Sequence, residues 1–382
     1  MNISGTLNKG GKRRAHGGEF LRAAACLALG AQLAAMPMAF AAGNGAAPTG
    51  AVNESNDPVL KTMQSELSRA TAELAKAEQP PYFLSYTVYD QKLVVMVGAY
   101  GSLLQNAAVQ RRSADVTMRV GTPALDNTHG QSRASGVTSG TLPLGDDTDA
   151  IARVLWELTD REYKRAAPAF LNVRTNTAVR AEEEDKSPDF SKEQSQTHIG
   201  ATAAAPAFDR AAWEAEIKRL SAAFRKYPNV YFATVVLQIQ DSNARTVSSE
   251  GSAVVTPSTS TRLVMEAQTR ADDGMDLLRV ETFQAPSASG LPSEVELTAK
   301  IDKMAEDLKA LRAAPVAEPY DGPALLSGRA AAVFFHEVLG HRLEGHRQRD
   351  EEEGQTFTKK VNQEVLPKFL SVADDPTIHE LA

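Results

Sequence analysis

The chain has 382 residues, of which 42% are hydrophobic and 23% are charged. This balance is typical of a soluble globular protein with enough apolar material for two or three domains, and it excludes disordered, collagen-like and multi-span membrane proteins. The 48 acidic residues outnumber the 41 basic ones, which gives a formal charge of −7, and no basic stripe with interleaved aromatic residues is present. Nucleic acid is therefore not expected as a partner.

Residues 1–41 have the composition of a cleaved secretory signal peptide. Five basic residues precede or enter an apolar stretch that ends at Phe40, and Ala39-Phe40-Ala41 has the small-x-small pattern that signal peptidase recognises. Gln32 and Pro37 interrupt the stretch, which disfavours an uncleaved membrane anchor. Cleavage would leave 36 Lys and Arg against 47 Asp and Glu, a charge of −11, and would remove Cys26, the only cysteine. We therefore expect a periplasmic or secreted protein with no stable membrane span.

Residues 57–178 are expected to form a first α+β region, after a small-residue tether at residues 42–56. Apolar residues recur at helical spacing from Leu60 to Ala77, where Pro80-Pro81 ends the helix. Asp147 can cap a second helix that runs toward Phe170. Between the helices, stretches rich in β-branched and aromatic residues predict an antiparallel meander, with turns at Asp90-Gln91 and Gly101-Ser102: Tyr82 to Tyr89, Leu93 to Tyr100 and Val109 to Val120.

Residues 179–209 lack periodicity and are expected to be a loop or linker. Residues 210–312 then repeat the pattern with a helix, a meander and a second helix. The predicted segments are Ala211 to Tyr227 (helix), Tyr231 to Ile239, Arg245 to Val255, Arg262 to Thr269 and Leu277 to Phe283 (strands), and Ser293 to Leu311 (helix). At an offset of 150 residues, Gly101-Ser102 aligns with Gly251-Ser252. The sequence thus predicts an α+β fold with two antiparallel-sheet and helix layers.

Residues 313–382 contain the candidate metal-binding and catalytic residues, which lie in the run RAAAVFFHEVLGHRLEGHRQRD that begins at Arg329. An apolar, helix-compatible stretch is followed by five metal-capable side chains: His336, Glu337, His341, Glu344 and His346. Imidazoles and carboxylates are ligands of divalent metals, and zinc commonly takes two histidines from one helical segment. The competing interpretation is a solvated helix face with charge pairs four residues apart.

The spacing of the histidines leaves two arrangements open. In a regular α-helix, His336 and His341 would lie about 140° apart in azimuth with a rise of about 7.5 Å, so they share an ion only if a π turn or break intervenes. Gly340 is where such a distortion is expected. Glu337 could then take a proton from water and pass it to a leaving amine. Alternatively, Glu337, His341 and Glu344 share one face of an undistorted helix, with Glu337 as a ligand and no general base.

The remaining polar features are expected to be structural. His129, His198 and His379 lie in loop-like or terminal sequence and are expected at the ordinary surface. Asp374-Asp375-Pro376-Thr377 predicts a turn, and Glu351-Glu352-Glu353 predicts a solvated run. No P-loop, dinucleotide fingerprint or G-x-S-x-G elbow is present in the sequence.

The segment HEVLGHRLEGH resembles the H-E-x-x-G-H-x-x-E-G signature of the TldD/PmbA (TldD/TldE) metalloprotease family. The similarity is close from Arg329 to Thr377 and loose over most of the rest. It implies a peptidase in which His336 and His341 bind Zn²⁺ and Glu337 is the catalytic residue. It also implies a homo- or heterodimer with a family member and an enclosed site that admits unfolded or short peptides. Glu344 would orient an imidazole through the ring nitrogen that faces away from the metal.

Two positions depart from the family pattern. His346 stands where family members usually have aspartate, a change that a secreted branch of relatives would tolerate. The family's third zinc ligand is a cysteine in a C-terminal domain, whereas this sequence has no cysteine after Cys26 and stops at Ala382. We therefore expect the amino-terminal part of a family member that lacks this domain. The alternative function is a catalytically inactive remnant that binds a peptide or a partner.

Overall fold

The computed structural model describes residues 57–129, 136–179, 188–200, 208–345, 347, 356–373 and 375. The predicted signal peptide at residues 1–41 and the tether at residues 42–56 lie outside this part of the chain. The same holds for His346, His379, Glu351-Glu352-Glu353 and most of the Asp374–Thr377 turn.

The chain alternates helices with unusually long strands. The helices are α2 (Pro58–Leu74), α3 (Thr148–Val179), α4 (Arg210–Ala223), α5 (Glu294–Ala313), α6 (Gly328–Phe335) and α7 (His341–Leu343). The strands are β1 (Pro81–Ala99), β2 (Ser102–Thr122), β3 (Leu125–Asp126), β4 (Val137–Thr141), β5 (Thr197–Ile199), β6 (Phe232–Ser248), β7 (Ala253–Arg270) and β8 (Asp276–Ala285). Short 3₁₀ segments lie at Phe224–Lys226, Ala288–Gly290 and Thr358–Lys360, and a π turn, η4, lies at His336–Gly340. Among the described residues, no helix is both long and apolar enough to cross a membrane.

All eight strands belong to one sheet, in the order β3-β2-β1-β6-β7-β5, with β4 paired to β2 and β8 paired to β7. Every pairing is antiparallel except that of β5 with β7. The predicted α+β class is confirmed. The two predicted meanders are joined edge to edge, because β1 pairs with β6 from Ser85↔Ser248 to Gly98↔Val235.

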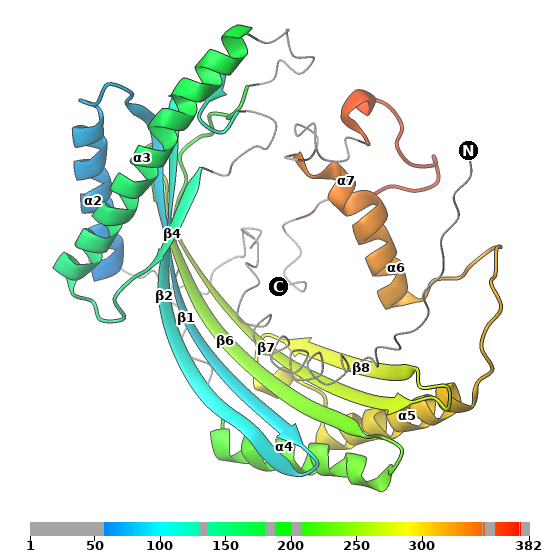
Figure 1. The fold of residues 1–382 in the computed structure, drawn as a ribbon. Coiled ribbons are helices and arrows are strands. Elements are labelled where there is room, and N and C mark those ends of the chain that lie inside the picture. Colours follow the sequence, from blue (N-terminus) through cyan, green and yellow to red (C-terminus); the bar gives the residue numbers. More distant parts are fainter. Residues whose placement is uncertain are drawn as a thin grey trace, which may run out of the picture. The chain divides into compact units, whose positions relative to one another are not determined.

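Two helix pairs cover the same face of this sheet at opposite ends of the long strands (Figure 1). In β6 the odd-numbered residues from Ala233 to Val247 face the helices, and most of them are buried. Helices α2 and α3 cover one core, where Tyr86 donates to or accepts from Thr159 across 2.8 Å. Helices α4 and α5 cover the other core. Each half of the predicted repeat therefore has a helix, a pair of long strands followed by shorter ones, and a second helix.

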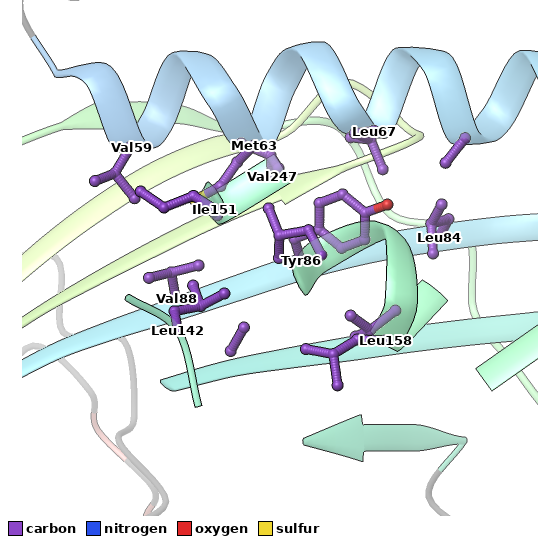
Figure 2. Close-up of a cluster of buried hydrophobic side chains, with 14 of the residues drawn as sticks. Val59, Met63, Leu67, Leu84, Tyr86, Val88, Leu142, Ile151, Leu158 and Val247 are labelled. Atoms are coloured by element: carbon purple, nitrogen blue, oxygen red, sulfur yellow. The ribbon is translucent and has the colours of Figure 1, made fainter. Parts of the chain in front are cut away.

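In the first core, the helical spacing of apolar residues on α2 places their side chains against the sheet. Val59, Met63 and Leu67 recur at four-residue spacing on α2 and point toward the sheet (Figure 2). They meet Leu84 and Tyr86, which alternate with outward-facing residues on β1. The helix begins where its sequence predicts, because Asp57 accepts a hydrogen bond from the Leu60 amide at 3.0 Å and Pro58 occupies the first turn.

One predicted turn and one predicted strand were wrong. Asp90-Gln91 is not a turn, because β1 runs straight through it and the Asp90 carboxylate lies between two arginines. Arg245 to Val255 is not one strand, because the chain reverses at Gly251, whose φ of +94° is readily adopted only by glycine. The predicted loop at residues 179–209 contains β5, which adds to β7 along Ala253–Val255.

A chain of ion pairs, buried except at Asp146, crosses the sheet between the two cores. Asp90 accepts from Arg112 at 2.6 Å and from Arg245 at 2.7 Å. Arg245 also donates to Asp57, the N-cap of α2, at 2.6 Å, and Arg112 reaches Asp146 at 2.9 Å, just before α3. The network therefore links the start of each helix of the first pair to the central strands. It explains why charged residues occupy the middle of strands, where their intrinsic β-propensity is poor.

Asp241 is a buried carboxylate outside this network. It is 9% exposed and its Oδ1 atom has no hydrogen-bond partner among the described residues. Burial raises the pKa of Asp241 above its usual value, and the charge of Lys92 on the neighbouring strand offsets this only in part. The ionised side chain thus opposes folding.

Replacing Asp241 with asparagine is expected to stabilise the protein at neutral pH and to have little effect near pH 3. Because the pKa of Asp241 is higher in the folded state, the wild-type protein loses stability as the pH rises from the unfolded pKa of about 4 through the folded pKa. The variant lacks this loss. Urea denaturation at a series of pH values measures the difference, and equal midpoints at pH 7 would contradict the assignment.

Candidate metal centre

The helical segment that carries the histidines contains a π turn. Helix α6 ends at Phe335, the π turn η4 covers His336–Gly340, and α7 continues from His341. The His341 amide donates to the His336 carbonyl, which is the wider hydrogen bond that defines this geometry. The distortion predicted from the five-residue spacing is therefore confirmed.

The π turn brings the two imidazoles face to edge. The ring centroids of His336 and His341 lie 4.3 Å apart, with the ring planes inclined at 69°. One ligand atom from each of His336, Glu337 and His341 lies within 4.8 Å of the others. Among the described residues, this is the one group of three or more such side chains placed closely enough to hold a metal ion. Two imidazoles and a carboxylate are suitable ligands for zinc and for other divalent transition metals.

Gly340 contributes space rather than an unusual backbone conformation. Its φ of −54° and ψ of −61° are ordinary helical values. A Cβ atom placed there would lie 4.0 Å from Nδ1 of His336 and 3.8 Å from the Phe335 carbonyl. The π turn ends at Gly340, where the distortion was expected, but its backbone does not require glycine. Alanine fits this site, whereas a longer side chain would extend toward the His336 ring.

Glu344 fixes the orientation of His341. Its carboxylate lies 2.7 Å from Nδ1 of His341 and accepts from Arg347 Nε at 2.7 Å. The hydrogen bond with His341 is the main reason that the pKa of Glu344 is lowered, with a further contribution from Arg347. An ionised Glu344 accepts a hydrogen bond from the Nδ1–H group of His341, which leaves Nε2 of the neutral ring as the ligand atom. The alternative set of Glu337, His341 and Glu344 is therefore not the one that converges, because Glu344 binds the ring from the opposite nitrogen.

Replacing Glu344 with glutamine is expected to weaken zinc binding by about 10- to 100-fold. Glutamine can still accept a hydrogen bond, but it no longer carries the charge that holds the Nδ1 proton and increases the basicity of the ring. Competition with a chromogenic chelator measures the affinity. Glu364→Gln, an exposed substitution on the same C-terminal segment, is the control and should leave zinc affinity unchanged.

The side chains around the donors are largely apolar and exposed in this chain. Phe334 and Phe335 are 47% and 40% exposed and contact each other edge to face at 5.6 Å. Leu339 in the π turn is buried. A metal site beside apolar side chains would have a low local dielectric once it is covered, which strengthens metal–ligand and acid–base interactions.

One histidine outside the motif was assigned wrongly from the sequence. His129 is not an ordinary surface residue, because its side chain is 12% exposed and Nδ1 lies 2.8 Å from the buried Asp189. Asp189 also accepts from the backbone amide of Asp126, which docks the segment after α3 onto the β2–β3 turn. Because 60 residues separate the pair, no local pattern could have revealed it. His198 is exposed, as predicted.

The segment that carries these donors is similar to a known protein family. Residues 319–382 match the family model of the PmbA/TldA metallopeptidase C-terminal domain. The resemblance to the TldD/PmbA family is thus confirmed over this C-terminal segment. No curated protein matches the chain.

Solved structures match part of the chain at low sequence identity. A putative modulator of DNA gyrase from Thermotoga maritima is 12% identical, with a TM-score of 0.38, over 67% of this chain and 50% of that chain. TldE from Thermococcus kodakarensis is 9% identical, with a TM-score of 0.37, over 65% of this chain and 47% of that chain. A putative modulator of DNA gyrase from Bacteroides thetaiotaomicron is 11% identical, with a TM-score of 0.40, over 66% and 50%. The chain spans about half the length of these structures.

Proposed function

We propose that this protein is a zinc-dependent peptidase of the TldD type that acts on unfolded or short peptides. The observation that carries the proposal is the π turn, which gathers His336, Glu337 and His341 within 4.8 Å on a segment matching a metallopeptidase family. In an unbroken α-helix the rings of His336 and His341 would lie on different sides of the helix and could not bind the same ion.

The residues present fit zinc. His336 and His341 would hold the ion through imidazole nitrogens, and Glu344 would keep the His341 ring in the tautomer that offers Nε2. When bound, zinc supplies a Lewis acid that acidifies water and polarises a carbonyl group. The remaining protein ligand would come from outside the described residues.

Glu337 would provide the acid–base step. It follows His336 directly, and its Oε1 lies 4.0 Å from Nε2 of that histidine, so its carboxylate is beside the donors. Glu337 would take a proton from the attacking water and deliver it to the nitrogen of the scissile amide as the C–N bond breaks. Its 62% exposed side chain can reach a substrate that approaches from solvent.

Zinc content and peptide hydrolysis, measured together on the purified chain, test the proposal. We expect about one zinc per chain after metal loading and cleavage of an unstructured peptide that stops on chelation. His336→Ala and His341→Ala should each lose both properties. A folded chain that binds peptide without metal or turnover would overturn the proposal in favour of the inactive binding protein.

Location and assembly belong to the same proposal. The N-terminal sequence supports export to the periplasm or the exterior. The resemblance of residues 319–382 to the TldD/PmbA family supports pairing with a second copy or with another family member.

A further inference from the structure

The carboxylate of Glu344 has a different partner on each oxygen. Oε1 lies 2.7 Å from Nδ1 of His341, and Oε2 accepts a hydrogen bond from Nε of Arg347 at 2.7 Å. Helix α7 ends at Leu343, and Glu344 follows it with a ψ of 122°, so the Glu344–Arg347 contact is not the ordinary surface pair of a regular helix. A carboxylate bonded through both oxygens has a fixed plane, whereas one bonded through a single oxygen can rotate about its last torsion.

All three side chains in this series of contacts are partly exposed. Those of His341, Glu344 and Arg347 are 31%, 34% and 33% exposed, so water competes for the oxygens of Glu344. Without Arg347, the Glu344 side chain could turn into solvent and release Nδ1 of His341. Arg347 therefore limits the positions that Glu344 can adopt beside the histidine ring.

His341 is the better fixed of the two predicted zinc ligands. The side chain of His336 is 62% exposed, and its Nε2 lies 4.0 Å from Oε1 of Glu337, beyond hydrogen-bonding distance. A ligand that is already held in one orientation and one tautomer binds a metal more tightly, because it loses less freedom on binding. The affinity of this centre therefore depends on the contacts that hold His341.

We infer that Arg347 is a positioning residue for the metal centre, acting through Glu344 to hold His341 with its proton on Nδ1 and with Nε2 available to bind zinc. This inference rests on the proposed zinc site, and it gives a role to a residue outside the H-E-x-x-G-H-x-x-E-G signature. A guanidinium that acted only through its charge would repel a divalent cation, and its removal would tighten zinc binding. The direction of the change in affinity therefore separates positioning from simple charge repulsion.

Zinc affinity, measured by competition with a chromogenic chelator, tests this role. Arg347→Ala should weaken zinc binding by about tenfold. Arg342→Ala is the matched control, because it removes the same charge next to His341 from a side chain that donates to Thr356 at 2.7 Å. It should not weaken binding. In a Glu344→Gln background, Arg347→Ala should change the affinity by less than about twofold, because its effect passes through the carboxylate.

The ring of His341 gives a second measurement that needs neither zinc nor turnover. ¹⁵N NMR of the metal-free full chain, labelled at histidine and recorded where the ring is neutral, reports which nitrogen carries the proton. The His341→Ala variant identifies the signal. We expect the Nδ1–H tautomer to dominate in the wild type and in Arg342→Ala, and to lose population in Arg347→Ala. Circular dichroism should show all variants folded as the wild type is.

Each outcome decides the inference. It is overturned if Arg347→Ala binds zinc as tightly as Arg342→Ala does, or more tightly, and also if the His341 tautomer does not change. Weaker binding together with the tautomer shift supports it. A wild-type chain that binds zinc but cleaves no peptide overturns the proposed function alone. A wild-type chain that binds no zinc overturns both, so the two failures are distinguishable.

Discussion

Replacing Glu337 with glutamine is expected to slow peptide hydrolysis by about 10²- to 10⁴-fold while zinc remains bound. Glutamine has nearly the same shape as glutamate, so the π turn and the positions of His336 and His341 should not change. It cannot accept and release a proton at neutral pH. The expected combination, metal retained and turnover lost, separates a proton-transfer role for Glu337 from a role as a metal ligand.

The experiment compares kcat/KM on an unstructured peptide with zinc content measured on the same samples. Glu306→Gln, on the exposed side of α5, is the matched control and should retain both activity and metal. If the zinc-loaded Glu337→Gln protein cleaves peptide as fast as the wild type, the proposed mechanism is wrong. If it loses zinc instead, Glu337 is a ligand and the general base lies elsewhere.

Replacing Asp90 with alanine is expected to lower the free energy of unfolding by about 3 to 5 kcal/mol. Asp90 is the shared partner of Arg112 and Arg245, whose side chains are 7% and 9% exposed. Removing it leaves two guanidinium groups buried with fewer acceptors. Arg112 retains Asp146 and two backbone carbonyls, and Arg245 retains Asp57, so the protein is expected to fold with reduced stability.

Urea denaturation followed by circular dichroism measures this effect. Arg111→Ala is the control, because Arg111 is adjacent to Arg112 but lies on the opposite face of β2 and bonds Gln91 in an exposed position. It should change stability by less than about 1 kcal/mol. Equal midpoints for the two variants would show that the buried network contributes nothing beyond a surface pair.

The local elements of the fold could be predicted because their signals lie within a few residues. Asp147 and Ser293 each precede a helix and accept the hydrogen bonds expected of an N-cap. The π turn followed from one argument, that His336 and His341 can converge only if the helix widens between them. These are local constraints on backbone geometry.

Long-range features escaped prediction for a physical reason. An aspartate in a strand-like stretch favours a turn, and only partners on other strands, Arg112 and Arg245, make Asp90 stable in the middle of β1. The joining of the two meanders depends on pairing between β1 and β6, which are 163 residues apart at Ser85 and Ser248. His129 and Asp189 are also brought together by tertiary contacts, which no periodic pattern in the sequence indicates.

X-ray absorption spectroscopy at the zinc edge, on the zinc-loaded full chain, tests most directly whether His336 and His341 bind the same zinc ion. We predict a shell that contains two imidazole nitrogens at about 2.0 Å and that disappears in the His336→Ala/His341→Ala double variant. A zinc shell without histidine, or one that is unchanged in the double variant, would contradict the assignment of the π turn as the metal centre.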